Sequence, residues 1–258
     1  NPEYTGQETS QGRKLPIINI LQSDKQYKAF GDDYDKVSMS MYGKLFVRTE
    51  RNSLDDLVDS VTGSFMKAQM GHEIYEDDGS GSSVLIASVS GLMRKDDKQN
   101  YELSNPGRKV VNTVKVILCL HSAKKASEML LKGENPFAIL VFKKASFNSW
   151  IEAQKAMNIK SLGSSIYQNK MSSELASTVF SFVVSSEKVE IKERKTEYYI
   201  PKVDVSLNDP AEAEALYKLA LELKSISLFG KEIVDEIKAE SKDVLNLDVR
   251  EAEATKID

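Results

Sequence analysis

Apolar and polar residues alternate over much of the middle of the chain, and this alternation predicts β-strands. The clearest case is residues 109–121, where Val114, Val116 and Leu118 share one face. Residues 137–142 are apolar on both sides, which is typical of a strand in the centre of a sheet. The other segments with strand character are residues 15–22, 44–49, 84–92, 178–184, 189–192 and 196–205.

Helices are predicted where apolar residues recur every three or four positions behind a capping residue. Ser53 precedes such a pattern, which extends to Phe65 and has Asp56 in the capping-box position. Ser146 begins a second predicted helix, in which Trp150 lies on the apolar stripe and is expected to be buried. The last two predicted helices start at Asp209 and near residue 226.

Polar stretches rich in Gly, Ser or charged residues separate these elements and are predicted to be loops or turns. They comprise residues 72–83, 93–108, 158–173, 185–188 and 193–195. The resulting organisation is a flexible arm (1–14), a main domain (15–205), a helical appendage (206–240) and an acidic tail (241–258). The expected fold class is α+β, mainly β.

The charge of the chain is distributed in three blocks. Residues 91–205 hold 19 Lys and Arg against 12 Asp and Glu, a net charge of +7. Residues 1–90 carry −5 (9 against 14), and residues 206–258 carry −6 (7 against 13). Because the local charge sets the local field, the basic block predicts a polyanion site although the whole protein is acidic.

Cysteine content and hydropathy limit the cellular compartments in which we expect the protein. The single cysteine, Cys119, excludes an internal disulfide and suits a reducing compartment. The longest strongly apolar stretch, residues 116–120, is too short to span a bilayer, and residues 1–14 lack a signal-peptide core. We therefore expect a cytoplasmic protein, in the host cytoplasm if it is viral. Since the sequence begins with Asn1, we also expect that it starts inside a longer gene product.

Metal and catalytic motifs are sparse, so we expect no metal and no cofactor. Cys119 and His121 share a strand face, but with His72 as the only other histidine they do not complete a tetrahedral site. One pattern is compatible with a metal-dependent nuclease: Glu190 and Lys192 lie two apart on a predicted strand. Cross-strand pairing on a solvent-exposed hairpin explains the same pattern.

Two segments combine cations with aromatic rings: residues 94–109 with Tyr101, and residues 192–199 with Tyr198 and Tyr199. Many proteins hold single-stranded nucleic acid in this way, because cations contact the phosphates and bases stack on the rings. The competing interpretation is that both are solvated loops with a tyrosine packed at the base. One lysine of the strand between them, Lys115, completes the candidate nucleic-acid-binding set. The set is Arg94, Lys95, Lys98, Tyr101, Arg108, Lys109, Lys115, Lys192, Arg194, Lys195, Tyr198 and Tyr199.

From residue 84 onward the expected order is strand, long loop, two strands, helix, two strands. An OB barrel also places its helix between the third and fourth strands and binds ligands with the loops joining strands 1–2 and 4–5. We therefore expect an OB-like barrel in residues 15–205, with an N-terminal β/α elaboration and C-terminal helices.

The chain also resembles the single-stranded-DNA-binding proteins of bacteriophages and related mobile elements. The resemblance lies in residues 15–22, in the strand 136–142 that runs into the Trp150 helix, and in Tyr198-Tyr199-Ile200-Pro201. It implies a non-enzymatic protein that binds single-stranded DNA in DNA replication or recombination. It also implies replication or recombination proteins as partners, and we expect any homo-oligomer to form through the C-terminal helices. A viral structural or adaptor protein that binds a protein partner through its basic face is the alternative, and a nuclease is the third.

Overall fold

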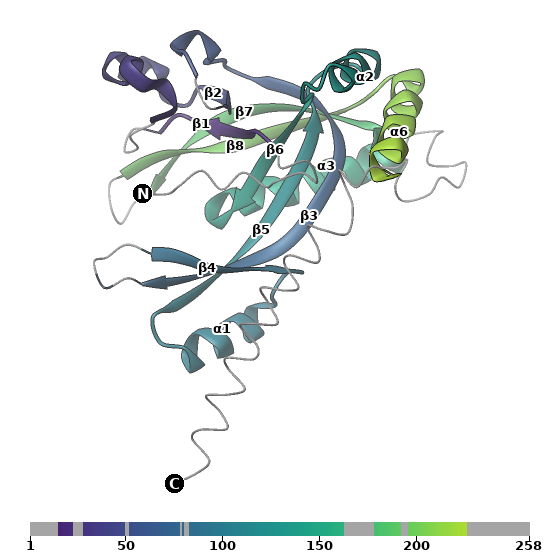
Figure 1. Cartoon of the computed structure of the whole chain (residues 1–258). Helices are drawn as coiled ribbons and strands as arrows, with labels where there is room; N and C mark the ends of the chain where they lie inside the picture. The colour runs from purple at the N-terminus through teal and green to yellow at the C-terminus, as the bar shows by residue number, and fades with distance from the viewer. Residues whose placement is uncertain are drawn as a thin grey trace.

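The chain folds around one curled sheet in the computed structural model (Figure 1). The structure describes residues 15–22, 28–49, 52–77, 79, 83–162, 178–191 and 196–225. The strands are β1 (Ile17–Ile20), β2 (Leu45–Arg48), β3 (Val61–Asp77), β4 (Ser83–Ser90), β5 (Arg108–Cys119), β6 (Phe137–Lys143), β7 (Phe180–Ile191) and β8 (Thr196–Leu207). The α-helices are α1 (Lys95–Ser104), α2 (Ala123–Leu131), α3 (Phe147–Leu162) and α6 (Pro210–Ser225). Short 3-10 helices are η1 (Lys28–Lys36), η2 (Met39–Met41), η3 (Leu54–Asp56) and η4 (Lys144–Ser146).

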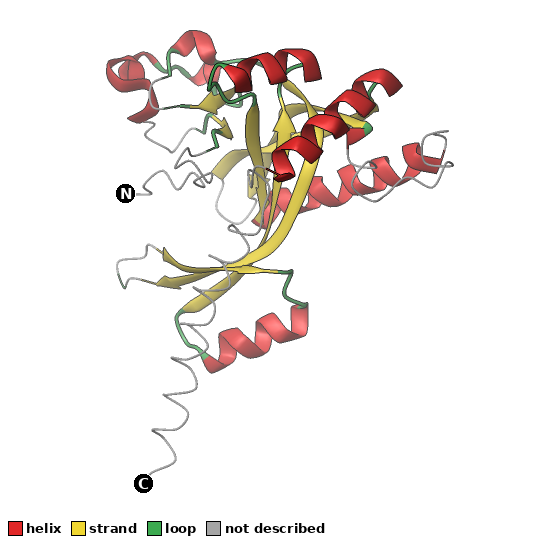
Figure 2. Ribbon diagram, turned by 45° about the vertical axis from the view of Figure 1, so that its right-hand side comes forward, coloured by secondary structure: helices red, strands yellow, loops and turns green. Residues whose placement is uncertain are grey.

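The sheet has eight strands in the order β2-β1-β6-β5-β3-β7-β8, and β4 pairs with β3 outside this path. All pairs are antiparallel except β1 with β6, which are parallel. The curl makes a half-barrel (Figures 1 and 2). The fold is therefore α+β and mainly β, as the sequence predicts.

Helices cover the two faces of the sheet separately (Figure 2). On one face, Trp150 of α3 packs against Val114, Val116 and Phe142 in the largest core cluster. On the other face, α2 and α6 cover Met66, Ile117 and Cys119, and Leu216 of α6 is fully buried there. This division follows from the strand alternation, because successive residues of β5 point to opposite faces.

The lower ends of β3 and β5 extend past the helix-covered body. With β4 and α1 they form a projecting lobe, which we call the arm: residues 71–77, 83–104 and 108–112 (Figure 1). The arm has its own small core of Ile74, Ala87 and Val110, packed against Met93 and Tyr101. It depends on the 17 residues of β3, which pair with β7 at one end and with β4 at the other.

The N-terminal hairpin of β1 and β2 meets the hairpin of β7 and β8 across the open side of the half-barrel. The Gln22 side chain both donates to the Tyr199 carbonyl oxygen (2.7 Å) and accepts from the Tyr199 amide (2.8 Å), as a paired strand would. Gly43 has a φ of +87°, and a Cβ there would lie 2.7 Å from the Tyr199 ring. Only glycine therefore fits this contact.

Several local predictions are confirmed. Residues 137–142 form a central strand, β6, between β1 and β5. Trp150 is 2% exposed, so its expected burial is correct. The helix expected at Asp209 is α6, where the Asp209 carboxylate accepts a hydrogen bond from the Ala211 amide. Glu212, however, accepts from the Ala123 amide and thus joins α6 to the start of α2.

Four element predictions are wrong. The capping box of Ser53 and Asp56 forms, but it starts only η3, and Phe65 lies in β3 rather than in a helix. The expected loop 72–83 is largely strand, because β3 runs to Asp77 in pairs with β5. The expected loop 93–108 contains α1, and the expected turn 185–188 lies within β7, which pairs with β8 without a break.

The expected OB arrangement is met only in part. β5 pairs with β6, β7 pairs with β8, and α3 follows β6 in sequence. In an OB barrel the first two strands pair with each other, whereas β4 pairs with β3 and not with β5. The reason is that β3 occupies that edge of β5 along nearly its whole length.

Three other predicted segments lie outside the described residues: the flexible N-terminal segment (1–14), the second C-terminal helix and the acidic tail (241–258). Among the residues that are described, no helix combines the length and the hydropathy needed to cross a membrane.

Candidate nucleic-acid interface

One face of the sheet carries a row of lysines, which starts beside Ile117 in the part covered by α2 and α6 and continues into the arm. Directly paired residues of adjacent strands project to the same face. Lys67 is paired with Ile117, Gln69 with Lys115, and Tyr75 with Lys109. Lys143 of β6 is paired with Thr113 on the same face, and Lys144 follows it. We call Lys67, Lys109, Lys115, Lys143 and Lys144 the lysine face.

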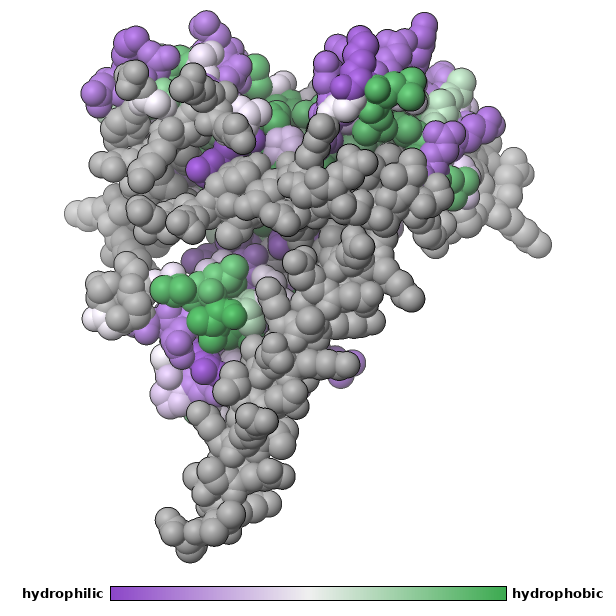
Figure 3. Space-filling model, viewed as in Figure 1, coloured by the Kyte–Doolittle hydropathy of each residue, from purple (hydrophilic) through white to green (hydrophobic). Residues whose placement is uncertain are grey.

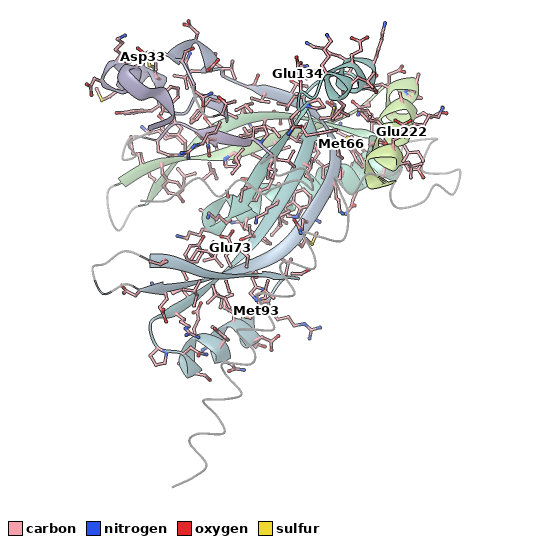
Figure 4. The ribbon with its side chains drawn as sticks, viewed as in Figure 1. Asp33, Met66, Glu73, Met93, Glu134 and Glu222 are labelled. Carbon is pink, nitrogen blue, oxygen red and sulfur yellow. The ribbon has the colours of Figure 1, made fainter. Side chains whose placement is uncertain are left out.

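A buried carboxylate anchors the centre of the lysine face. Glu73, which is 7% exposed, accepts hydrogen bonds from the Tyr75 hydroxyl and from the Lys143 ammonium (3.3 Å to Oε2). The Lys143 ammonium also lies 2.9 Å from the Tyr75 hydroxyl oxygen. Figure 4 labels Glu73 on the part of β3 that enters the arm. The three side chains thus hold one another in place.

The protonation states of this cluster follow from its surroundings. Burial and the hydrogen bond to Glu73 raise the pKa of Tyr75 above its ordinary value. Burial alone would lower the pKa of Lys143, but the charge of Glu73 and the hydrogen bond with Tyr75 outweigh it, so the pKa of Lys143 is raised. At neutral pH, Tyr75 is therefore a neutral phenol and Lys143 a cation.

The Tyr75 ring is flanked by two cations. The Lys143 and Lys144 ammonium nitrogens lie 5.6 and 5.8 Å from its centroid, within the range of cation–π attraction. Lys144 adopts a φ of +54°, unusual for a residue with a side chain, in the turn between β6 and α3. Two positive charges and one half-buried ring are thereby presented together.

A shallow pocket opens beside this cluster, between β3, β4 and β5. Its polar lining comes mainly from residues of the lysine-face side: Gln69, Glu73, Ser88, Ser90, Thr113 and Lys115. Hydroxyl, amide and ammonium donors of this kind can contact phosphate or sugar oxygens.

Of the sequence-predicted residues, Lys109 and Lys115 lie on the lysine face. Arg94, Lys95, Lys98 and Tyr101 lie at or in α1, which packs on the opposite face of the arm against Ile74 and Val110. Arg108 starts β5 and forms an ion pair with Glu76 (3.1 Å), and Lys98 forms one with Glu102 (3.8 Å). The Tyr101 ring is packed in the core of the arm with its hydroxyl buried.

The second predicted segment lies elsewhere. Tyr198 and Tyr199 are in β8, and Tyr199 packs against Gly43. Lys192, Arg194 and Lys195 lie outside the described residues. Both views place the start of β8 beside the body and α1 at the end of the arm (Figures 1 and 2). Of the second segment the structure therefore places only Tyr198 and Tyr199, which lie apart from α1.

Sequence reasoning missed Lys67, Tyr75, Lys143 and Lys144. Lys67 lies between the predicted helix, which extends to Phe65, and the predicted loop 72–83, and Tyr75 falls within that loop. Residues 69–75 give no clear strand signal, because Gly71 and the polar His72 interrupt the alternation of Met70 and Ile74 with polar positions. Lys143 could have been found by continuing the alternation of β6 by one residue.

Groups of metal-ligating residues are not found where the structure is described: no three His, Cys, Asp or Glu side chains there are placed to hold an ion. Cys119 is buried, which raises the pKa of its thiol to about 11, and its Sγ lies 3.2 Å from the His121 carbonyl oxygen. Glu190 is paired with Glu197 of β8, which forms an ion pair with Lys188 (2.6 Å).

Comparison with known proteins gives no match: no family model fits the sequence, and neither a curated protein nor a solved structure shows significant similarity.

Proposed function

We propose that the lysine face binds single-stranded DNA without catalysing a reaction. The observation that supports this most is the row of lysines along one sheet face, which ends with two ammonium groups beside the Tyr75 ring. Phosphates are contacted by such cations, and a base can approach the half-buried ring edge. The charges lie on rigid paired strands, which keeps their spacing fixed in the absence of a ligand.

Single-stranded DNA is favoured over duplex for a geometric reason. A duplex hides the faces of its stacked bases, whereas an unpaired strand can offer them to the Tyr75 ring on the lysine face. An unpaired strand can follow the curl and place its bases against Tyr75 and the polar pocket. In this proposal the protein binds DNA on a curled sheet, as OB-type proteins do. It would act in DNA replication or recombination in the cytoplasm.

The proposal is tested by titrating a fluorescently labelled oligonucleotide, single- and double-stranded, at two salt concentrations. Tighter binding of the single strand is expected, with log affinity falling by about 0.7 per phosphate contact for each unit of log salt. The double variant Lys67→Glu/Lys115→Glu should lower the affinity more than about tenfold and reduce the salt slope by about 1.4.

The matched control is Lys155→Glu/Lys160→Glu, which makes the same change of charge on α3, against the other face of the sheet. It should leave affinity and salt slope nearly unchanged. Equal effects of both double variants would show that only net charge matters, and equal affinity for duplex would contradict the proposal. Absence of any DNA binding would favour the alternative, a basic face that contacts a protein partner.

A further inference from the structure

A glycine forms the floor of the shallow pocket on the lysine face. Gly71 lies midway between Gln69 and Glu73 of β3, whose Cα atoms are about 13 Å apart on an extended strand. The register partners of Gly71 are Ser90 of β4 and Thr113 of β5. A Cβ at position 71 would lie 2.6 Å from a backbone carbonyl oxygen of β4, so only glycine lets the two strands approach this closely. The pocket is therefore bounded by side chains of three strands and has backbone as its floor.

One oxygen of the buried Glu73 carboxylate remains available to a ligand. Oε2 accepts both hydrogen bonds of the cluster, from the Tyr75 hydroxyl and from the Lys143 ammonium. Oε1 accepts none from the residues that the structure describes, and it is not closed off from solvent. Since Glu73 is 7% exposed and lines the pocket, the pocket is the opening through which Oε1 is reached. A buried acceptor without a donor favours a ligand that supplies one.

Four further polar side chains of the pocket are neutral. Within the described part of the chain, the Gln69 amide and the Ser88 and Ser90 hydroxyls form no hydrogen bond with another residue. The Thr113 hydroxyl donates to a backbone carbonyl oxygen of its own strand (3.3 Å), which leaves its oxygen able to accept. Lys115, which is paired with Gln69, lies at the end away from the carboxylate. The pocket thus combines one carboxylate acceptor with amide, hydroxyl and ammonium groups.

Within a DNA strand, hydrogen-bond donors are found on the bases alone. The phosphate and sugar oxygens are acceptors, which a carboxylate oxygen repels. Cytosine, adenine and guanine each carry an exocyclic amino group, whereas thymine has only one N–H, flanked by the acceptors O2 and O4. A carboxylate oxygen that approached this N–H would meet both thymine oxygens. The free oxygen of Glu73 therefore fits a base with an amino group better than it fits thymine.

We propose that this pocket binds the edge of one unpaired base and selects for an amino group, which donates to Glu73 Oε1. Gln69 and Ser90 then face the ring nitrogen or carbonyl oxygen beside that amino group. Glu73 is thus a specificity-determining residue and also holds Lys143 and Tyr75 in place. The inference rests on the function proposed above, because a base reaches the pocket as part of a bound strand.

The surface next to the pocket does not discriminate between bases. Leu85 of β4 is paired with Tyr75 and so lies on the same face, beyond Glu73. Val84, Leu85 and Ile86 are 53%, 39% and 37% exposed, and Figure 3 shows a hydrophobic patch over this part of the arm. A tyrosine ring and apolar side chains can contact the face of any base. The pocket therefore adds a preference at one position to a surface that otherwise accepts all bases.

The test compares the binding of labelled oligo(dC) and oligo(dU) of equal length at pH 8. Both are pyrimidine homopolymers without a 5-methyl group, so they present the same base in every register and differ at the edge that enters the pocket. Wild-type protein should bind oligo(dC) about tenfold more tightly, which is the effect of one hydrogen bond to a charged group.

Two variants remove the selectivity of the pocket in different ways. Glu73→Gln replaces the carboxylate by an amide that can also donate to O4 of uracil. Ser90→Leu covers Gly71 with an apolar side chain from an exposed position. Each should bring the ratio of the two affinities close to one. The ratio is the readout because Glu73→Gln also disturbs Lys143 and Tyr75, which lowers both affinities together.

The matched controls make the same substitutions outside the pocket. Glu76→Gln removes a carboxylate of β3 that is paired with Arg108, and Ser83→Leu changes an exposed serine at the far end of β4. Both should keep the preference of the wild type. Unchanged Trp150 fluorescence in each variant checks that the body remains folded, because Trp150 lies on α3, outside the arm.

The outcomes separate this inference from the proposed function. A preference for oligo(dC) that is lost in both pocket variants and kept in both controls supports the inference. Equal or weaker binding of oligo(dC) by the wild type would overturn it and leave the proposed function standing. So would a preference that survives either pocket variant or disappears in either control. Absence of binding to both oligonucleotides would overturn the proposed function and this inference together.

Discussion

Along one face of β3 and β5, the upper half around Met66 and Ile117 is covered by α2 and α6, whereas none of the described helices covers the lower half around Glu73 and Lys109 (Figure 4). The same two strands, paired on both sides of one register shift between Phe65 and Lys67, carry mostly apolar side chains in the first half and lysines, hydroxyls and a carboxylate in the second. The comparison shows how a single long strand pair can supply a core at one end and a candidate binding surface at the other.

The two halves should therefore respond differently to mutation, and the largest difference is expected for stability. Leu216→Ala removes a fully buried side chain of α6 over the upper half and should lower the free energy of unfolding by about 2–5 kcal/mol. Lys109→Ala in the exposed lower half should change it by less than about 0.5 kcal/mol. Urea unfolding followed by Trp150 fluorescence measures both. Similar losses for the two variants would mean that the lower half is also covered.

A smaller effect is expected at Glu73, the buried carboxylate of the lower half. Glu73→Gln weakens the contacts with Lys143 and Tyr75 and should lower the free energy of unfolding by about 1–3 kcal/mol. Glu152→Gln, which breaks the exposed pair with Lys155, is the matched control and should cost less than about 1 kcal/mol. If Glu73→Gln costs no more than its control, the cluster does not stabilise the arm.

The smallest effect concerns alkaline pH. The pKa values of Tyr75 and Lys143 are raised in the folded protein above their ordinary values of 10.0 and 10.5. Above about pH 10 the unfolded chain releases these protons before the folded chain does, so stability falls as pH rises. Urea midpoints between pH 8 and 11 should decline less steeply for Tyr75→Phe than for the wild type. Parallel declines would show that Tyr75 does not contribute.

Local signals in the sequence were sufficient for part of the fold. Three elements depend only on interactions within a few residues or on contact with any apolar neighbour. They are the alternating strand 109–121, the strand 137–142 that is apolar on both sides, and the helix start at Asp209-Pro210. Burial of Trp150 follows in the same way, because an apolar stripe on a helix is buried whatever lies opposite. The basic character of the middle block was also readable, since charge needs no coordinates.

Long-range pairing decided the rest. Residues 54–65 have helical spacing and a correct capping box, but β3 gains pairs with β5 and β7 that one helix cannot match. Residues 93–108 lack a clear apolar stripe, and α1 is held instead by Met93 and Tyr101 against the core of the arm. Local propensity is a weak prior, and tertiary contacts routinely override it.

The candidate site divides along the same line. The sequence by itself determined that cations gather in the middle of the chain, and it included Lys109 and Lys115 in the candidate binding set. Only the tertiary structure decided that Lys67 and Lys143 join them on one face of the sheet, with Lys143 bonded to Glu73, and that Tyr101 and Tyr199 are packed elsewhere. The physical reason is that a face of a sheet is assembled from strands distant in sequence, so its composition depends on strand order and register, which no single segment encodes.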